Sequence, residues 1–114
     1  MKEKLNILVV CGKNKKRSRT AEYIFKNDAR FKIRSVGLSS KSNRKITEKD
    51  ILLSDLIFVM EEGKSSRIQG VYRHINLPPI EILHIEDKYE YLDSELMTLL
   101  TDRINDTLKI VYKI

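Results

Sequence analysis

The chain has 114 residues, 41% of them hydrophobic, which suits one packed domain spanning residues 1–114 and argues against intrinsic disorder. Its formal net charge of +6 at pH 7 and isoelectric point near 9.5 suit an anionic substrate, nucleic acid or an anionic membrane surface. No apolar run approaches the ~20 residues of a membrane span, and the run after Lys4 is too short for a signal peptide, so we expect a cytoplasmic protein with no membrane partner.

The first half of the chain predicts two strands and two helices in alternation. Leu5–Val10 is apolar enough for a strand buried on both faces, and Phe31–Val36 alternates as a second strand. Between them, residues 18–27 carry an apolar stripe at helical spacing. A short helix is expected to begin near Thr47, because Asp50, three residues later, can complete a capping box.

The second half continues the alternation. Asp55–Met60 predicts a third buried strand, Glu61–Gln69 a helix ending at Gly70, and Ile80–Ile85 a fourth strand. A long helix is expected to start near Asp93, because apolar residues then recur every three or four positions. The order β, α, β, α, β, α, β, α predicts an α/β fold: a three-layer domain with a four-stranded parallel sheet and helices on both faces.

The segment CGKNKKRS, from Cys11 to Ser18, follows the first strand at the edge of the sheet where ligands bind in such folds. A thiol, five residues, an arginine and a hydroxyl is a spacing by which one tight loop can wrap a phosphate. Backbone N–H groups and the positive end of the following helix can converge on one oxyanion. We therefore expect a phosphate-binding loop that holds inorganic phosphate or sulfate, with these substrate-binding residues: Gly12, Lys13, Asn14, Lys15, Lys16 and Ser18.

Three side chains of this loop predict catalysis. Cys11 is the candidate nucleophile, because the loop amides, the helix end and Arg17 would stabilise its thiolate. Arg17 has the planar fork that can bind two phosphoryl oxygens at once and follow them into the transition state. Ser18 could donate a hydrogen bond to the thiolate. Together they predict a cysteine-dependent phosphatase.

Four blocks of the sequence, in order and covering most of the chain, resemble the low-molecular-weight protein tyrosine phosphatases: NILVVCGKNKKRSRTAEYIF, RSVGLSS, RKITEKDILLSDLIFVMEE and IEDKYEYLDSEL. The resemblance implies a shortened member of that family that hydrolyses phosphotyrosine or similar aryl phosphate monoesters through a phosphocysteine intermediate. It also implies that the substrate is a phosphorylated protein or a small aryl phosphate. The implied mechanism needs neither a cofactor nor a metal.

By resemblance, Asp87 in the fourth block is the general acid that protonates the departing oxygen and then activates water. Glu86, Glu90 and Asp93 are nearby carboxylates that spacing alone does not separate from Asp87, and Asp93 also suits a helix N-cap. Tyr89 falls where the family places an aromatic wall beside the substrate ring, although an exposed loop tyrosine is an equal alternative.

Asn14 would hold the loop in shape by resemblance, since asparagine tolerates a left-handed backbone and can hydrogen-bond to Ser18. Two departures from the family pattern stand out: Lys88 replaces the proline that follows the acid, and Lys16 replaces a second loop cysteine, so the chain has no resolving thiol. With the chain shortened after Ser40, the loop lysines suggest a shallow cationic entrance that accepts larger or more acidic phosphorylated substrates.

Other functions remain open at this point. An inactive phosphatase-like module that binds phosphorylated ligands is the main alternative, and an arsenate reductase would need an external thiol because Cys11 is the only cysteine. Arg17 and Asp87 count against a phosphate-carrying domain of sugar phosphotransferases, which must not promote hydrolysis. Nucleic acid is disfavoured as a partner because the basic run lacks interleaved aromatic residues. No metal is expected, since His74 and His84 are isolated from other ligands.

Overall fold

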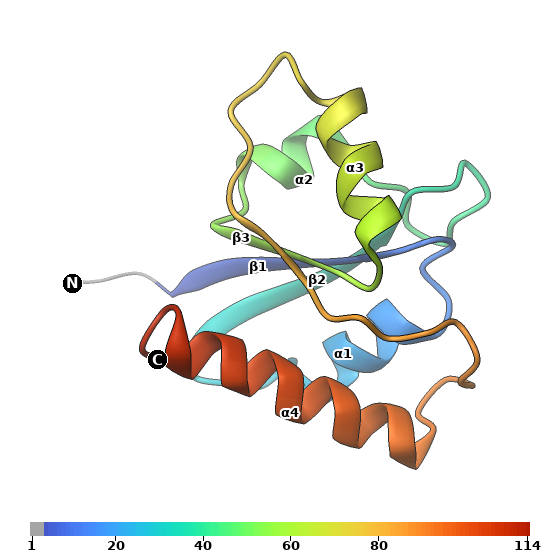
Figure 1. Cartoon of the computed structure of the whole chain (residues 1–114), viewed down its shortest axis with the longest axis vertical. Helices are drawn as coiled ribbons and strands as arrows, with labels where there is room; N and C mark the ends of the chain where they lie inside the picture. The colour runs from blue at the N-terminus through green and yellow to red at the C-terminus, as the bar shows by residue number, and fades with distance from the viewer. Residues whose placement is uncertain (1–3) are drawn as a thin grey trace.

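Four parallel strands form the centre of the molecule. The computed structural model describes residues 4–114 (Figure 1). One sheet, in the order β2-β1-β3-β4, contains β1 (Leu5–Cys11), β2 (Phe31–Gly37), β3 (Leu56–Val59) and β4 (Ile80–Ile82). The helices are α1 (Arg17–Phe25), α2 (Glu48–Leu52), α3 (Glu62–Val71) and α4 (Ser94–Ile110). The order of the elements confirms the predicted α/β class.

Helices cover both faces of the sheet, with α1 and α4 on one side and α2 and α3 on the other (Figure 1). The strand β1 contributes side chains to the cores on both sides of the sheet, because successive side chains of a strand point to opposite faces. Ile7, Val9 and Cys11 pack in the core with α1 and α4, whereas Leu8 and Val10 pack in the core with α2 and α3. The sheet is therefore buried on both faces, which confirms the predicted three layers.

The helix α4 lies across its face of the sheet through one apolar stripe, at the spacing seen in the sequence. Its buried residues are Leu96, Leu100, Ile104 and Leu108. The carboxylate of Asp93 caps the helix, accepting hydrogen bonds from the backbone N–H groups of Glu95 at 2.9 Å and Leu96 at 3.3 Å. This confirms the predicted N-cap. Within residues 4–114, no helix combines the length and apolar character needed to cross a membrane.

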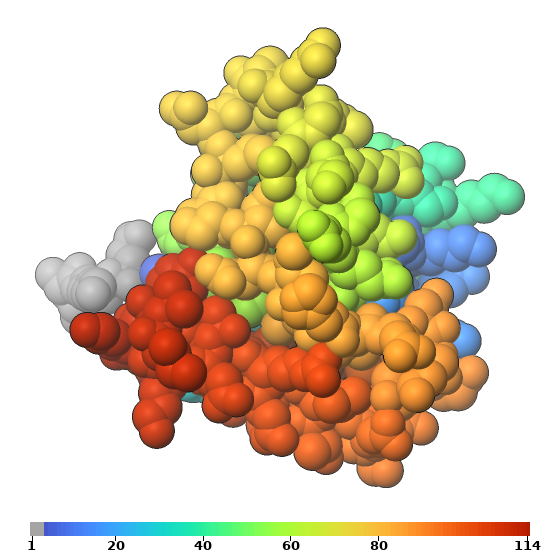
Figure 2. Space-filling view, viewed as in Figure 1, coloured from blue at the N-terminus to red at the C-terminus, as the bar shows by residue number. Residues whose placement is uncertain are grey.

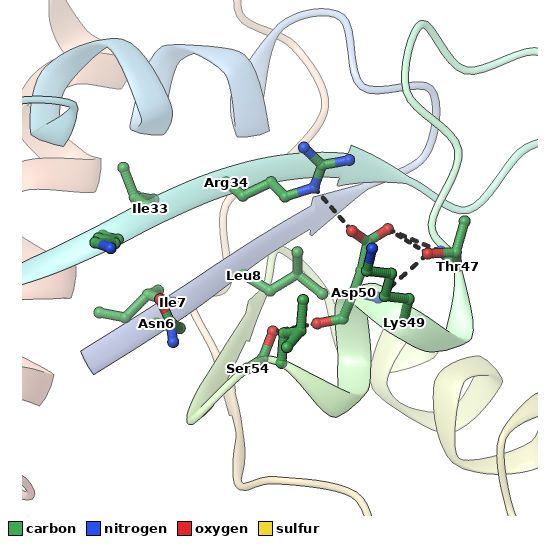
Figure 3. A pocket seen from close by; sticks show the side chains of 11 residues that line it. Asn6, Ile7, Leu8, Ile33, Arg34, Thr47, Lys49, Asp50 and Ser54 are labelled. Atoms are coloured by element: carbon green, nitrogen blue, oxygen red, sulfur yellow. Dashed lines mark hydrogen bonds and ion pairs between the residues drawn. The ribbon is translucent and has the colours of Figure 1, made fainter. Parts of the chain in front are cut away.

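The helix α2 begins with the predicted capping box (Figure 3). Thr47 Oγ1 accepts from the backbone N–H of Asp50 at 3.2 Å, and Asp50 Oδ2 accepts from the backbone N–H of Thr47 at 2.9 Å. Arg34, on β2, donates its Nε–H to the second carboxylate oxygen of Asp50 at 2.8 Å. One side chain therefore both starts α2 and ties it to the sheet.

The end of β4 differs from the sequence prediction. The strand β4 ends at Ile82 rather than Ile85, because His84 has a left-handed backbone with φ 56°. Backbone hydrogen bonds from Leu83 and Ile85 to β3 and to Met60 still hold this segment beside the sheet. The following residues, 83–93, pass between α3 and the start of α4 on the surface in Figure 2.

The helices α1 and α3 also end elsewhere than expected. Gly70 was predicted to stop α3, but no glycine in the described residues has a positive φ, so the helix continues to Val71. The helix α1 stops at Phe25, two residues before the predicted end. There Asp28 donates its backbone N–H to the carbonyl of Phe25, and its carboxylate accepts hydrogen bonds from the guanidinium of Arg30.

Candidate active site

The loop between β1 and α1 is held from behind by the segment that follows β2. The backbone carbonyls of Cys11, Gly12, Lys13 and Asn14 accept hydrogen bonds from residues 38–43. Because the N–H of a trans peptide points opposite to its carbonyl, the loop N–H groups point away from that segment. In the described part of the chain, those of residues 13–16 donate to no backbone carbonyl.

The helix α1 starts directly after these free amides. Its N-cap residue, Lys16, makes no side-chain capping hydrogen bond. Helix N-termini without a side-chain cap carry unpaired N–H groups and partial positive charge. The loop and the helix end therefore offer one continuous set of donors to an anion.

Gly37, at the end of β2, allows the loop to approach the sheet closely. A Cβ atom at this position would lie 2.7 Å from the backbone nitrogen of Asn14 and 2.8 Å from the carbonyl carbon of Lys13, and would also meet Ser42 Oγ. Carbon atoms do not approach backbone atoms so closely without displacement. The block RSVGLSS thus contributes the surface on which the loop rests.

The sulfur of Cys11 and the hydroxyl oxygen of Ser18 lie 2.9 Å apart, and both residues are buried. Asn14 donates its Nδ2–H to the same Ser18 oxygen at 3.0 Å. With that oxygen accepting from Asn14, the hydroxyl proton of Ser18 is available to the sulfur. The backbone of Asn14 is left-handed, with φ 54°, as the sequence predicted.

Arg17 is 4% exposed and joins three parts of the site. Its Nη1 donates to the backbone carbonyl of Ile85 at 2.6 Å and to Glu61 Oε1 at 3.2 Å, and its Nε lies 3.7 Å from Asp87 Oδ1. A buried guanidinium with two carboxylate neighbours is fixed in orientation. The arginine predicted to bind phosphoryl oxygens is thus fixed between the loop and the segments that carry Glu61 and Asp87.

A cavity of about 520 Å³ opens in front of these groups. Seven of the predicted residues line it: Cys11, Gly12, Lys13, Lys15, Lys16, Arg17 and Asp87. Ser18 and Asn14 do not line it and act from beneath the loop.

The cavity wall also contains Glu61 and Lys64, which the sequence reasoning did not select. Both follow β3, the neighbour of β1 in the sheet. Their place just after a buried strand could have identified them, because the carboxyl ends of adjacent parallel strands meet at one edge.

Among the four candidate acids in the described chain, Asp87 is the one that lines this cavity. Glu90 instead lies 3.2 Å from Lys16 Nζ, and Asp93 caps α4. The carboxylate of Asp87 is 69% exposed, so it can reach both a substrate and water. The geometry therefore favours Asp87 over its rivals as a proton donor to a group in the cavity.

Tyr89 does not line the cavity in this structure. Its hydroxyl donates a 2.6 Å hydrogen bond to Glu95, which raises the pKa of Tyr89 to about 12, and its ring packs partly against the core. It follows Asp87 by two positions on the same segment. A part in substrate binding stays a prediction for this residue.

No family model matches the sequence, and no curated protein matches it. Solved structures do match the fold. The low-molecular-weight protein tyrosine phosphatase SP-PTP from Streptococcus pyogenes superposes with a TM-score of 0.78 at 19% identity, over 94% of this chain and 93% of that one. The tyrosine phosphatase Wzb from Escherichia coli K30, in complex with phosphate, gives 0.76 at 19% identity, over 96% and 99%.

The chain has the low-molecular-weight protein tyrosine phosphatase fold. The YwlE arginine phosphatase from Geobacillus stearothermophilus shares this fold too, with a TM-score of 0.65 at 17% identity over 92% of this chain and 93% of that one. Similarity at such identities establishes the fold alone, and function must be argued from the site.

In this low-molecular-weight phosphatase fold, the segment carrying Asp87 is joined to α1 at several points. Lys16 pairs with Glu90, the backbone N–H of Leu92 donates to Thr20 Oγ1 at 3.0 Å, and Arg19 lies 5.0 Å from the ring centre of Tyr91. These contacts hold the segment that has Lys88 where proline was expected. Asp87 therefore lines the cavity even though lysine, and not proline, follows it.

A second cavity, of about 470 Å³, lies toward the other end of β1, beside α2 (Figure 3). One of its cations, Arg34, is already paired with Asp50, whose other oxygen accepts the backbone N–H of Thr47 at the start of α2. Within residues 4–114, no cluster of three or more His, Cys, Asp or Glu side chains could hold a metal ion. The groups suited to phosphate chemistry gather in the loop cavity of the phosphatase fold.

Proposed function

We propose that the chain is a cysteine-dependent phosphatase that hydrolyses phosphotyrosine or similar aryl phosphate monoesters through a phosphocysteine intermediate. The observation that carries the proposal is the 2.9 Å contact between Cys11 Sγ and Ser18 Oγ beneath a loop of unpaired N–H groups. The fold, shared with solved tyrosine phosphatases, supports the same reaction class.

Substrate binding would use the donors around the loop. The nonbridging phosphoryl oxygens accept hydrogen bonds from the N–H groups of residues 12–17, and the guanidinium of Arg17 pairs with two of them. Arg17 then exchanges part of its contact with Glu61 and Asp87 for contact with the phosphoryl group. The loop lysines Lys13, Lys15 and Lys16 add attraction for the dianion.

In the first step, the thiolate of Cys11 attacks phosphorus and the bond between phosphorus and the aryl oxygen breaks. The departing oxygen takes the proton of Asp87, so the phenol leaves neutral. In the second step, the carboxylate of Asp87 accepts a proton from water, whose oxygen attacks phosphorus. The phosphorus–sulfur bond breaks, and inorganic phosphate leaves with the Cys11 thiolate restored.

The remaining residues would support these steps. Ser18 donates to the sulfur when it is negatively charged, which favours both its attack and its later departure, and Asn14 keeps the Ser18 oxygen in place. Tyr89 would contact the substrate ring beside Asp87. We place the activity in the cytoplasm, where Cys11 stays reduced, and propose a phosphorylated protein or a small aryl phosphate as substrate.

Hydrolysis of an aryl phosphate by the purified chain tests the proposal. Activity is expected in the unsubstituted protein and should be lost in Cys11→Ser, which keeps the loop contacts but lacks the nucleophile. Phosphotyrosine peptides should be hydrolysed faster than phosphoserine peptides. Binding of phosphate without any turnover would instead identify an inactive module, and turnover that survives Cys11→Ser would exclude the phosphocysteine mechanism.

A further inference from the structure

The loop cavity carries more positive charge than one phosphoryl group needs. Five cationic side chains line it, Lys13, Lys15, Lys16, Lys64 and Arg17, against two carboxylates. Both carboxylates, Glu61 and Asp87, lie against Arg17. They therefore balance the arginine and leave the lysines without acidic neighbours from within the cavity wall.

Three of these lysines have no ion-pair partner in the described chain. Lys16 pairs with Glu90, but none of the ion pairs formed by residues 4–114 includes Lys13, Lys15 or Lys64. Lys13 and Lys15 project from the loop after β1, and Lys64 comes from the first turn of α3, after β3. The free charge thus lies where the ends of two adjacent strands meet.

The segment with Asp87 and the helix with Lys64 lie in opposite layers of the fold. The segment that carries Asp87 is bonded to α1, in the layer shared with α4. Lys64 belongs to α3, in the opposite layer. A substrate bound in the cavity would have the segment with Asp87 on the α1 side of its phosphoryl group and Lys64 on the α3 side, with Lys13 and Lys15 on the loop between them.

Aromatic contacts do not dominate this cavity. None of the described residues that line it is aromatic, and the hydroxyl of Tyr89 is bonded to Glu95 outside it. The cavity wall itself therefore forms no ring pocket, and any contact with a substrate ring would come from Tyr89 beside the cavity. Charge is the property of the wall that can distinguish one phosphate monoester from another.

We propose that Lys13, Lys15 and Lys64 form a second anion subsite, which recognises an additional acidic group next to the scissile phosphate of the substrate. The inference rests on the proposed phosphatase function and specifies its substrate class. The acidic group is a carboxylate or a second phosphate, since both pair with ammonium groups. Lys64 is then a specificity-determining residue on the α3 side of the site.

Binding to the Cys11→Ser variant tests the subsite without requiring turnover. Two phosphotyrosine peptides of equal length are compared by fluorescence anisotropy, one with Asp and Glu flanking the phosphotyrosine and one with Asn and Gln in their place. We expect the acidic peptide to bind roughly tenfold more tightly at low salt, and this preference to shrink at 0.5 M NaCl.

Lysine substitutions in the same background then locate the effect. Each of Lys13→Ala, Lys15→Ala and Lys64→Ala should reduce the ratio of the two dissociation constants about two- to fivefold, and the triple variant should bring it close to one. Lys109→Ala, at an exposed lysine in the last turn of α4, is the matched control and should leave the ratio unchanged. Thermal unfolding checks that every variant is folded.

An unchanged ratio in the triple variant, or equal affinity for the two peptides in the starting variant, overturns the subsite. A third peptide with phosphoserine beside the phosphotyrosine identifies the group: tighter binding than the acidic peptide assigns the subsite to a phosphate, and equal or weaker binding assigns it to a carboxylate. Turnover by the chain with Cys11 intact is measured separately, so loss of the phosphatase proposal is distinguishable from loss of the subsite.

Discussion

The guanidinium of Arg17 donates a 2.6 Å hydrogen bond to the backbone carbonyl of Ile85, two residues before Asp87. The same guanidinium lies 3.7 Å from the carboxylate of Asp87. One buried side chain therefore connects the phosphate-binding loop to the segment that carries the candidate acid. The loop that contains Cys11 and the segment that contains Asp87 are thereby held relative to each other through this arginine.

Replacing Arg17 with lysine should lower kcat/KM for an aryl phosphate by about a hundredfold or more. Lysine keeps the charge but cannot make paired contacts to two phosphoryl oxygens, and it cannot bridge Ile85 and the substrate together. Steady-state kinetics measure the effect, and Arg67→Lys on the exposed side of α3 is the control. A loss of less than threefold would show that the planar fork is not needed.

The hydrogen bond from Ser18 to the sulfur predicts the effect of Ser18→Ala. Hydrogen bonds to charged groups contribute about 1.5–3 kcal/mol, so kcat should fall about tenfold to a hundredfold. The release of phosphate from the phosphocysteine should slow most, and a burst of phenol before the steady state would reveal this. Ser40→Ala, at an exposed serine, should leave kcat as it is. Equal kcat values for both variants would contradict the role of Ser18.

Asp87→Asn should slow hydrolysis by about a hundredfold or more for substrates with poor leaving groups, since general acid catalysis typically contributes that much. Substrates with acidic phenols need less protonation and should lose less. Glu86→Gln and Glu90→Gln provide the controls, because neither residue lines the cavity. A larger loss in either control than in Asp87→Asn would move the acid to that residue.

Asp93, the fourth carboxylate of this set, should affect stability rather than catalysis. Asp93→Ala removes the side-chain cap of α4 and should reduce the free energy of unfolding by about 1 kcal/mol. Chemical denaturation measures this loss, and kcat of the folded fraction should stay near that of the unsubstituted chain. Unchanged stability would mean that the cap is dispensable.

Gly37→Ala should distort the loop after β1, although Gly37 lies outside that loop. The new methyl group would meet the backbone of Lys13 and Asn14, so the loop must shift or the strand end must move. Overpacking of this kind typically costs about 1–3 kcal/mol, and kcat/KM should fall because the loop amides lose their alignment. Gly63→Ala, where an added carbon meets nothing within 4 Å, is the control. Full activity in Gly37→Ala would show that the loop does not depend on this close approach.

The pair Asp28–Arg30 should make stability depend on pH. The hydrogen bonds from the Arg30 side chain lower the pKa of Asp28 below its usual value. A carboxyl with a lowered pKa in the folded state stabilises the fold above its unfolded pKa of about 3.9, and this contribution is lost as the pH falls through the folded value. Asp28→Asn should therefore lower the free energy of unfolding at pH 7 by about 0.5–1 kcal/mol.

Thermal unfolding at pH 7 and near pH 2.5 checks this prediction. The difference between Asp28→Asn and the unsubstituted chain should be clear at pH 7 and should become small at the lower pH. Asp102→Asn, at an exposed aspartate of α4 with no ion pair in the described chain, serves as the comparison at both pH values. A difference that is the same at both would show that the charge of Asp28 is unimportant.

Local features of the sequence determined most of the secondary structure of this protein. The apolar run of β1, the capping box at Thr47 and the N-cap at Asp93 depend on residues a few positions apart, and all three are present in the structure. The loop after β1 is local in the same way, so the juxtaposition of Cys11 and Ser18 followed from their spacing and the turn at Asn14.

Tertiary structure decided which residues from distant segments join the site, because the composition of the site depends on which strand ends meet at one edge of the sheet. Asp87 is distinguished from Glu86 and Glu90 only by its reach into the cavity, and Lys64 joins the site because β3 lies beside β1. The end of β4 at Ile82, where the backbone of His84 turns left-handed, was not evident from the pattern of residues around it. The sequence alone could predict a thiol in a phosphate loop; packing between distant segments placed an acid and a free lysine beside it.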